Sequence, residues 1–251
     1  PFYGIKTGFN EAFLIDTATR DQLVSDDPNA ADIIKPYLRG QDIGRWLPEW
    51  AGLWMIVMKS SSDHAWPWAG AATEAEAEAI FAESYPSIHR RFKGLESFRR
   101  DGKLKGLRHR EDQGRFWWEL RPCAYYDAFE KPKIIYQVIQ YYPQYAVDRS
   151  GALSNDKTFF FSLESPVTIG TLNSPLLWWF NWRHLPHMKD EALSPMAYRM
   201  ERVPICEPLE EDRLAFVDAT NGCIDLTAHI READEAICDW LSTETGVRSI
   251  P

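Results

Sequence analysis

A continuous apolar segment at residues 53–58, Leu-Trp-Met-Ile-Val-Met, limits the fold more than any other feature of the chain. A run of this length without alternating polar residues is typical of a strand covered on both faces. Further strands are predicted at Lys133 to Tyr142, Tyr145 to Val147 and Thr158 to Ser162, with a loop rich in Ser, Gly, Asn and Asp between the last two. The chain therefore needs a sheet with cover on both sides.

Helices are predicted to supply that cover. Residues 73–82 combine high helix propensity with acids in the first turn, and Pro86 begins a second amphipathic helix. Other predicted elements are helices at 18–24, 28–34, 172–182, 207–217 and 227–241 and a short edge segment at 203–205. We expect an α+β domain (1–207) with a mixed or antiparallel sheet and flanking helices, followed by a short helical C-terminal extension (208–251).

Composition and missing motifs exclude several classes of function. No apolar run approaches the roughly 18 residues of a membrane helix, and the four cysteines form no C-x-x-C pair, which predicts a soluble cytoplasmic protein with reduced thiols. Phosphate-loop, dinucleotide, zinc-protease and serine-hydrolase motifs are absent. A nuclease-like group has the wrong spacing (Asp127, Glu130, Lys131 and Lys133). His184 and His187 flank a proline and have no nearby cysteine pair, so we expect neither a metal site nor catalysis.

Charge is distributed unevenly along the chain. The whole sequence has 28 basic and 37 acidic residues, a net charge of −9, whereas residues 84–121 carry eleven Lys/Arg against five acids. This basic segment predicts a face that meets an anion. Its centre, residues 101–106, is predicted to be a flexible basic loop, and the tryptophans at 117 and 118 could stack on exposed bases. The alternative is a solvated helix face and loop, with both tryptophans in the core.

Several segments together resemble the TaqI-like C-terminal specificity domain, in the order of that family. They are residues 4–16 (GIKTGFNEAFLID), 34–43 (IKPYLRGQDI), Tyr85-Pro86 before a helix, 117–121 (WWELR), 129–136 (FEKPKIIY), 172–174 (LNS) and 203–205 (VPI). The family is the target-recognition half of N6-adenine DNA methyltransferases, found in Eco57I-like type II restriction-modification enzymes and in related phage-defence methylases. Cys206 stands where the family has a second proline.

The resemblance implies a DNA-binding role without catalysis in this chain. The domain would hold double-stranded DNA and place an adenine for flipping into an upstream methyltransferase domain, which would bind S-adenosylmethionine. The chain, which does not begin with Met, would then be a fragment of that methyltransferase, and whether the parent also cleaves DNA stays open. Because the net charge is −9, we expect the upstream domain to share the phosphate contacts.

Candidate DNA-contacting residues come from the glycine-containing turn, the Arg39-Gly40 turn and the basic segment. They are Lys6, Thr7, Asn10, Arg39, Arg90, Arg91, Arg99, Arg100, Lys103, Lys105, Arg108, Arg110 and Arg115. Purely structural roles are the alternative: Gly4 and Gly8 would only shape the turn, and Arg39 would pair with Asp42.

Two other functions remain open from the sequence. The tryptophan content and acidic balance also fit a carbohydrate- or peptide-binding module, which would need exposed coplanar tryptophan rings beside acids. An interaction domain that docks another subunit would instead show an exposed apolar stripe on residues 227–241.

Overall fold

The computed structural model describes residues 1–246. The strands are β1 Phe2–Tyr3, β2 Leu14–Asp16, β3 Ile34–Leu38, β4 Leu53–Ile56, β5 Phe98–Arg100, β6 Lys103–Lys105, β7 Lys133–Gln137, β8 Tyr145–Asp148, β9 Leu153–Ser154 and β10 Thr158–Phe161. The α-helices are α1 Asn10–Phe13, α2 Thr17–Asp26, α3 Ala30–Ile33, α4 Glu74–Ser84, α5 Pro86–Gly94, α6 Tyr126–Phe129, α7 Pro166–Leu172, α8 Pro175–His184, α9 Ala197–Met200 and α10 Glu210–Thr245. Short 3-10 turns are η1 Gly40–Asp42, η2 Leu107–His109 and η3 Lys189–Glu191.

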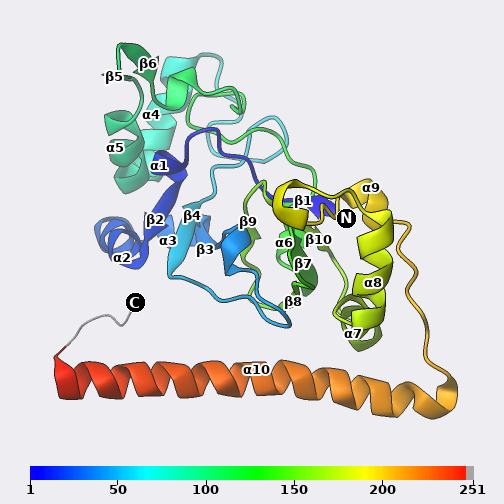
Figure 1. Ribbon diagram of the computed structural model, residues 1–251. Helices are drawn as coiled ribbons and strands as arrows, with labels where there is room; N and C mark the ends of the chain where they lie inside the picture. Colours follow the sequence, from blue (N-terminus) through cyan, green and yellow to red (C-terminus); the bar gives the residue numbers. More distant parts are fainter. Residues whose placement is uncertain (247–251) are drawn as a thin grey trace.

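Two four-stranded sheets form the centre of the molecule (Figure 1). One is antiparallel, in the order β1-β10-β7-β8, and the other has the order β2-β4-β3-β9 with β3 and β9 parallel. The predicted α+β class with mixed and antiparallel sheets is therefore confirmed. Helices α4 and α5 lie beside the mixed sheet, whereas α7 and α8 lie beside the antiparallel one.

The antiparallel sheet separates two hydrophobic clusters, because successive side chains of a strand point to opposite faces. Ile135 and Phe160 belong to the larger cluster with the mixed sheet and helices α4 and α5. Ile134, Tyr136 and Phe159 belong to the smaller cluster, which includes residues of α7, α8 and α10. Both faces of this sheet are therefore covered.

The glycine-containing turn after β1 is held tightly against the connection between β9 and β10. A Cβ on Gly4 would lie 1.8 Å from the carbonyl oxygen of Asn155, and the Ile5 N–H donates to the carbonyl of Ser154 at 2.6 Å. Gly8 has φ +68°, a conformation that favours glycine. The turn is thus fixed by close backbone packing as well as by its own residues.

Four local predictions were wrong in detail. The two C-terminal helices are one 36-residue helix, α10, because Gly222 alone does not break it. The strand from Lys133 ends at Gln137, since the chain turns toward Gln140, which pairs with Leu193. The predicted helix at 172–182 is the end of α7 plus α8, because Pro175 starts a new helix. The segment at 203–205 forms no strand. Within residues 1–246 no helix is both long and apolar enough to cross a membrane.

Candidate nucleic-acid interface

The predicted basic loop is a β-hairpin formed by β5 and β6. Its two-residue turn, Asp101-Gly102, has φ +52° and +75°, the positive values that a tight hairpin turn of this kind requires. Strand pairing places Phe98 opposite Lys105 and Arg100 opposite Lys103. These four side chains share one face of the hairpin, and Arg99 lies on the other with Leu104.

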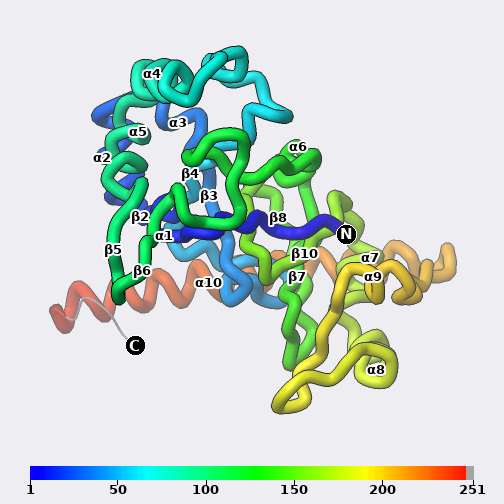
Figure 2. Tube along the Cα trace, turned by 90° about the horizontal axis from the view of Figure 1, so that it is seen from above, coloured from blue at the N-terminus to red at the C-terminus, as the bar shows by residue number. Residues whose placement is uncertain are grey.

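The hairpin face with Arg100, Lys103 and Lys105 is turned toward the glycine-containing turn. Phe98 packs on Phe9 with ring centroids 6.0 Å apart, and the Arg100 guanidinium donates to both carboxylate oxygens of Glu11 at 2.7 and 3.0 Å. Figure 2 shows the hairpin beside α1, which follows the glycine-containing turn. Arg100, Lys103 and Lys105 therefore lie beside the surface that the glycine-containing turn forms.

Three adjoining hollows run from the hairpin across the turn, and together we call them the groove. The first, about 370 Å³, lies between the hairpin and the turn. The second, about 410 Å³, lies over the turn and shares Gly8, Phe9 and Glu11 with the first. The third, about 360 Å³, shares Asn10 and Asn155 with the second and reaches the Arg39-Gly40 turn.

The groove is lined by side chains that can read or grip a polar ligand. Its amide and ammonium groups come from five separate parts of the sequence: Lys6, Asn10, Gln41, Lys105, Gln137, Asn155 and Lys157. Amides of Asn and Gln pair well with adenine edges, and lysines bind phosphate. The sequence reasoning missed Gln41, Gln137, Asn155 and Lys157, since only the tertiary fold brings them to the turn.

Four cations of the groove are paired with an acid: Arg100 with Glu11, Lys157 with Asp156 at 3.6 Å, and Lys6 and Arg39 as follows. Lys6 Nζ lies 3.0 Å from Asp112, which raises the lysine pKa, and about half of the lysine side chain stays exposed. Arg39 donates to both carboxylate oxygens of Asp42 at distances from 2.7 to 3.1 Å, as the structural alternative proposed. Asp42 and Asp112 are buried, at 5% and 9% exposure, so a phosphate that took Lys6 or Arg39 would leave a buried carboxylate without its cation, which makes these two cations less available than unpaired ones.

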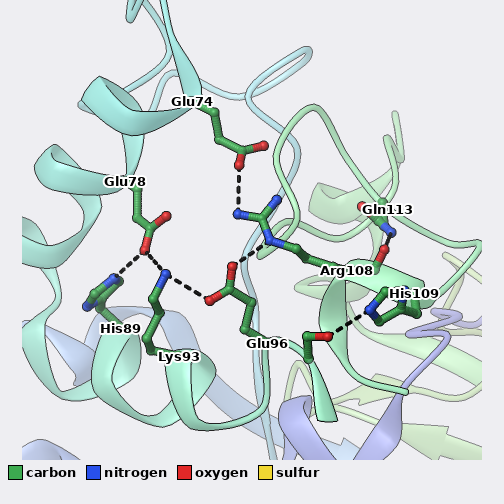
Figure 3. Close-up of polar contacts among 9 residues, drawn as sticks. Glu74, Glu78, His89, Lys93, Glu96, Arg108, His109 and Gln113 are labelled. Carbon is green, nitrogen blue, oxygen red and sulfur yellow. Dashed lines mark hydrogen bonds and ion pairs between the residues drawn. The ribbon is translucent and has the colours of Figure 1, made fainter. Parts of the chain in front are cut away.

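Part of the basic segment is neutralised by acids from helix α4, which precedes it in the chain. Arg108 binds Glu96 at 2.5 Å and Glu74 at 2.7 Å, and Lys93 binds Glu78 and Glu96 at 2.7 and 2.8 Å (Figure 3). Burial would raise the pKa of Glu78, but hydrogen bonds from Lys93 and His89 outweigh it and hold that pKa below its usual range. The expected single positive face therefore does not exist around α5.

Other predicted contacts serve the fold instead. Arg110 is 7% exposed and donates to the carbonyls of Thr7 (2.9 Å), Asp112, Trp117 (3.2 Å) and Glu119. Burial lowers the pKa of Arg110 to about 10, so the guanidinium stays protonated at neutral pH.

Arg91 and Arg115 behave in the same way. Each donates to two backbone carbonyls, Arg91 to those of residues 11 and 12 and Arg115 to those of residues 69 and 71. Burial lowers the pKa of Arg91. Thr7 is buried and donates to Asn10 Oδ1 at 2.5 Å.

Three predicted cations have no ion pair or side-chain hydrogen bond within residues 1–246, namely Arg99, Lys103 and Lys105. All three are exposed on the hairpin. Arg90 is exposed as well, but it lies 3.6 Å from Asp26 on α2. Judged by the contacts of residues 1–246, the hairpin is the one part of the basic segment that offers cations to an external anion without first releasing an acid or a backbone carbonyl.

The aromatic and metal-binding candidates do not add to the groove. Trp117 and Trp118 are buried at the core, as the alternative to base stacking proposed. The stacked pair of Trp66 and Trp68, with centroids 4.8 Å apart, is also buried. In residues 1–246 no group of three His, Cys, Asp or Glu side chains could hold a metal ion.

Comparison with known proteins gives a likeness of fold. No family model matches the chain, and neither does any curated protein. A solved structure with a similar fold is the Type IIL restriction-modification enzyme MmeI in complex with DNA, with a TM-score of 0.52 and 12% sequence identity over 91% of this chain. The match covers 28% of the MmeI chain, so this chain spans under a third of that enzyme. The fold resembles that of part of a restriction-modification enzyme.

Proposed function

We propose that the chain is a sequence-specific recognition domain for double-stranded DNA, without catalytic activity of its own. Its parent would be an N6-adenine DNA methyltransferase of the restriction-modification type, related to the TaqI-like specificity family. The domain would hold the duplex so that an adenine flips into the S-adenosylmethionine-binding domain of the same protein.

The observation that carries the proposal is the hairpin beside the groove. Lys103 and Lys105, which have no ion pair within residues 1–246, share a face of the hairpin with Arg100. Arg100 and Lys105 line the first hollow of the groove, which adjoins the hollows lined by amides of Asn and Gln. Cations that fix the register on phosphates, next to side chains able to read base edges, are the two parts that sequence-specific binding needs. The fold likeness to an enzyme solved with DNA supports the same function.

The carbohydrate- or peptide-binding alternative has weaker support. It calls for exposed coplanar tryptophan rings, whereas the coplanar pair Trp66 and Trp68 is buried and Trp50 and Trp54 meet edge to face at 89°.

The test is DNA selection and salt titration with the full-length parent protein. From a pool of random duplexes we expect enrichment of one short sequence, and no enrichment would refute sequence-specific recognition. The double variant K103A/K105A should flatten the plot of log affinity against log salt by about 1.8, because each phosphate contact contributes about 0.9. Between 50 and 200 mM salt this removes a roughly tenfold change in affinity.

The matched control is R99A, which removes another exposed cation without an ion pair in residues 1–246, from the opposite face of the same hairpin. We expect it to change the slope by less than half a unit, on the order of what a remote charge contributes. If R99A and the double variant reduced the slope equally per charge, the groove face would not be the contact surface.

A further inference from the structure

Helix α10 extends well beyond the part of it that packs on the domain. Its buried residues are Thr220 and Ile224, which lie against α7, and Arg231 donates to the carbonyls of Leu47 and Pro48 at 2.7 and 2.6 Å. From residue 232 to residue 240 every side chain is exposed. In Figure 2 this end of the helix projects past the body of the domain.

A stripe of large apolar side chains runs along the face of α10 opposite the packed one. Leu226, Ile230, Ile237 and Trp240 are 62%, 61%, 54% and 61% exposed. Their spacings of four, seven and three, with Ala233 in the gap, follow the heptad pattern of helices that pack along a seam. Because a helix turns about 100° per residue, this stripe faces away from Thr220, Ile224 and Arg231.

Such a stripe calls for a partner for two physical reasons. Contiguous apolar surface exposed on a helix marks an interaction site more often than scattered apolar residues do. In addition, a helical segment of about 14 residues is marginal in water without packing on its apolar face, and residues 232–245 have no buried side chain.

The charges beside the stripe indicate the chemistry of that partner. Residues 225–245 contain six acids and one arginine, and Arg231 is already bound to backbone carbonyls. Asp225, Glu232 and Asp239 run along one side of the stripe and Asp234 along the other. A second copy of the chain would set these acids against each other, which disfavours pairing, whereas basic flanks complement them.

We propose that the stripe of Leu226, Ile230, Ile237 and Trp240 docks an amphipathic helix of a partner protein, with an apolar seam and lysine- or arginine-rich flanks. The two helices pack side by side over three turns or more, with the apolar rows buried and the basic flanks against the acids of α10. This surface lies on α10, which contributes no residue to the groove, so it operates independently of DNA binding.

The test uses a synthetic 21-residue helical peptide with leucine at both seam positions and lysine at the flanks, and a matched peptide with glutamate at the flanks. Binding of each labelled peptide to the chain is measured by fluorescence anisotropy at 150 mM salt, roughly the physiological ionic strength. We expect the lysine peptide to bind at least tenfold more tightly than the glutamate peptide. Equal binding, or no binding of either, would overturn the proposal.

Variants locate the binding to the stripe. Ile230→Gln with Ile237→Gln should weaken the lysine peptide at least tenfold, and circular dichroism checks that α10 stays helical, since glutamine is a good helix former. Glu235→Gln introduces the same residue on the far side of the helix and should change binding less than twofold. If the double variant bound the lysine peptide as tightly as the parent chain, the stripe would not be the docking surface. If the parent chain formed dimers that the double variant abolished, the stripe would bind a second copy of the chain and the proposal would be wrong.

Discussion

Arg110 and Arg99 look alike in the sequence, and the structure predicts opposite consequences of replacing them. Both belong to the basic segment, yet Arg110 is buried with four backbone carbonyls around its guanidinium, whereas Arg99 is exposed and unpaired within residues 1–246. We consider the variants Arg110→Met and Arg99→Met, because methionine keeps most of the aliphatic stem of arginine and removes the charge.

The loss of stability in Arg110→Met can be worked out from the contacts. Four hydrogen bonds at about 1 kcal/mol each give about 4 kcal/mol. Removing a buried charge recovers part of this, and the stem keeps its place beside the ring of Phe13, so we expect a net loss of roughly 3 kcal/mol. With a urea m value of about 2–3 kcal/mol/M, the midpoint falls by about 1–1.5 M. Arg99→Met should stay within about 0.5 kcal/mol of the parent chain.

The assay is equilibrium urea unfolding followed by tryptophan fluorescence and by circular dichroism, with coincident curves as the check on two-state behaviour. If Arg110→Met unfolded within about 0.5 kcal/mol of the parent chain, the guanidinium would not be the support of the turn that its contacts indicate. If Arg110→Met were as stable as the parent chain but bound DNA more weakly, Arg110 would have to be a DNA-contacting residue.

Three further predictions concern the core, the pH dependence and helix α10. Asp148→Asn leaves the ammonium of Lys133, 2.6 Å away and fully buried, without its counter-charge, so the free energy of unfolding should fall by about 3–5 kcal/mol in urea titrations; a loss below about 1 kcal/mol would contradict this. The folded pKa of Glu78 lies below its ordinary value of 4.5, so the stabilisation from its ion pair is complete above pH 4.5 and is lost as pH falls through the folded pKa. E78Q should therefore flatten the decline in urea midpoint from pH 7 to pH 3. Parallel curves for E78Q and the parent chain would contradict this prediction. Gly170→Ala places a Cβ 2.4 Å from a side chain of α10 and should destabilise the chain by about 1–3 kcal/mol. The Cβ of Gly222→Ala would meet no atom of residues 1–246 within 4 Å, so this variant should be more stable by about 0.5–1 kcal/mol in the same assay. Equal effects of the two substitutions would refute the tight packing of α7 on α10.

Features of the fold that depend on neighbouring residues could be predicted from the sequence. The apolar run at 53–58 indicated the buried strand β4, and the acids of residues 74–76 together with Pro86 marked the starts of α4 and α5. The hairpin turn is equally local, since Asp101-Gly102 supplies positive φ angles, although the sequence reasoning expected only a loop there. Helix α10 exceeded the prediction because its continuity past Gly222 depends on packing against α7.

The site was harder to predict, because the fate of each cation is decided by residues far away in the chain. Counting charge over residues 84–121 left out Glu74 and Glu78, which neutralise Arg108 and Lys93 from the adjacent helix. Backbone carbonyls carry no formal charge and are invisible to any such count, yet they occupy Arg110. Where the partner lies within a few positions in the chain, the sequence does predict it. The pairing of Arg39 with Asp42 was proposed as the structural alternative and is confirmed.

The number of available cations also bears on how a domain of this kind could hold DNA. Four face the groove from the hairpin and the glycine-containing turn, Lys6, Arg100, Lys103 and Lys105, and two of them must first leave an acid. At about 0.9 per phosphate contact these four supply a salt slope of about 3.6, below the slope of about 5–9 that 6–10 phosphate contacts would give. Since the chain as a whole is anionic, its own contribution to binding is better suited to selecting a sequence than to holding the duplex, and most of the phosphate contacts would fall to the proposed methyltransferase half.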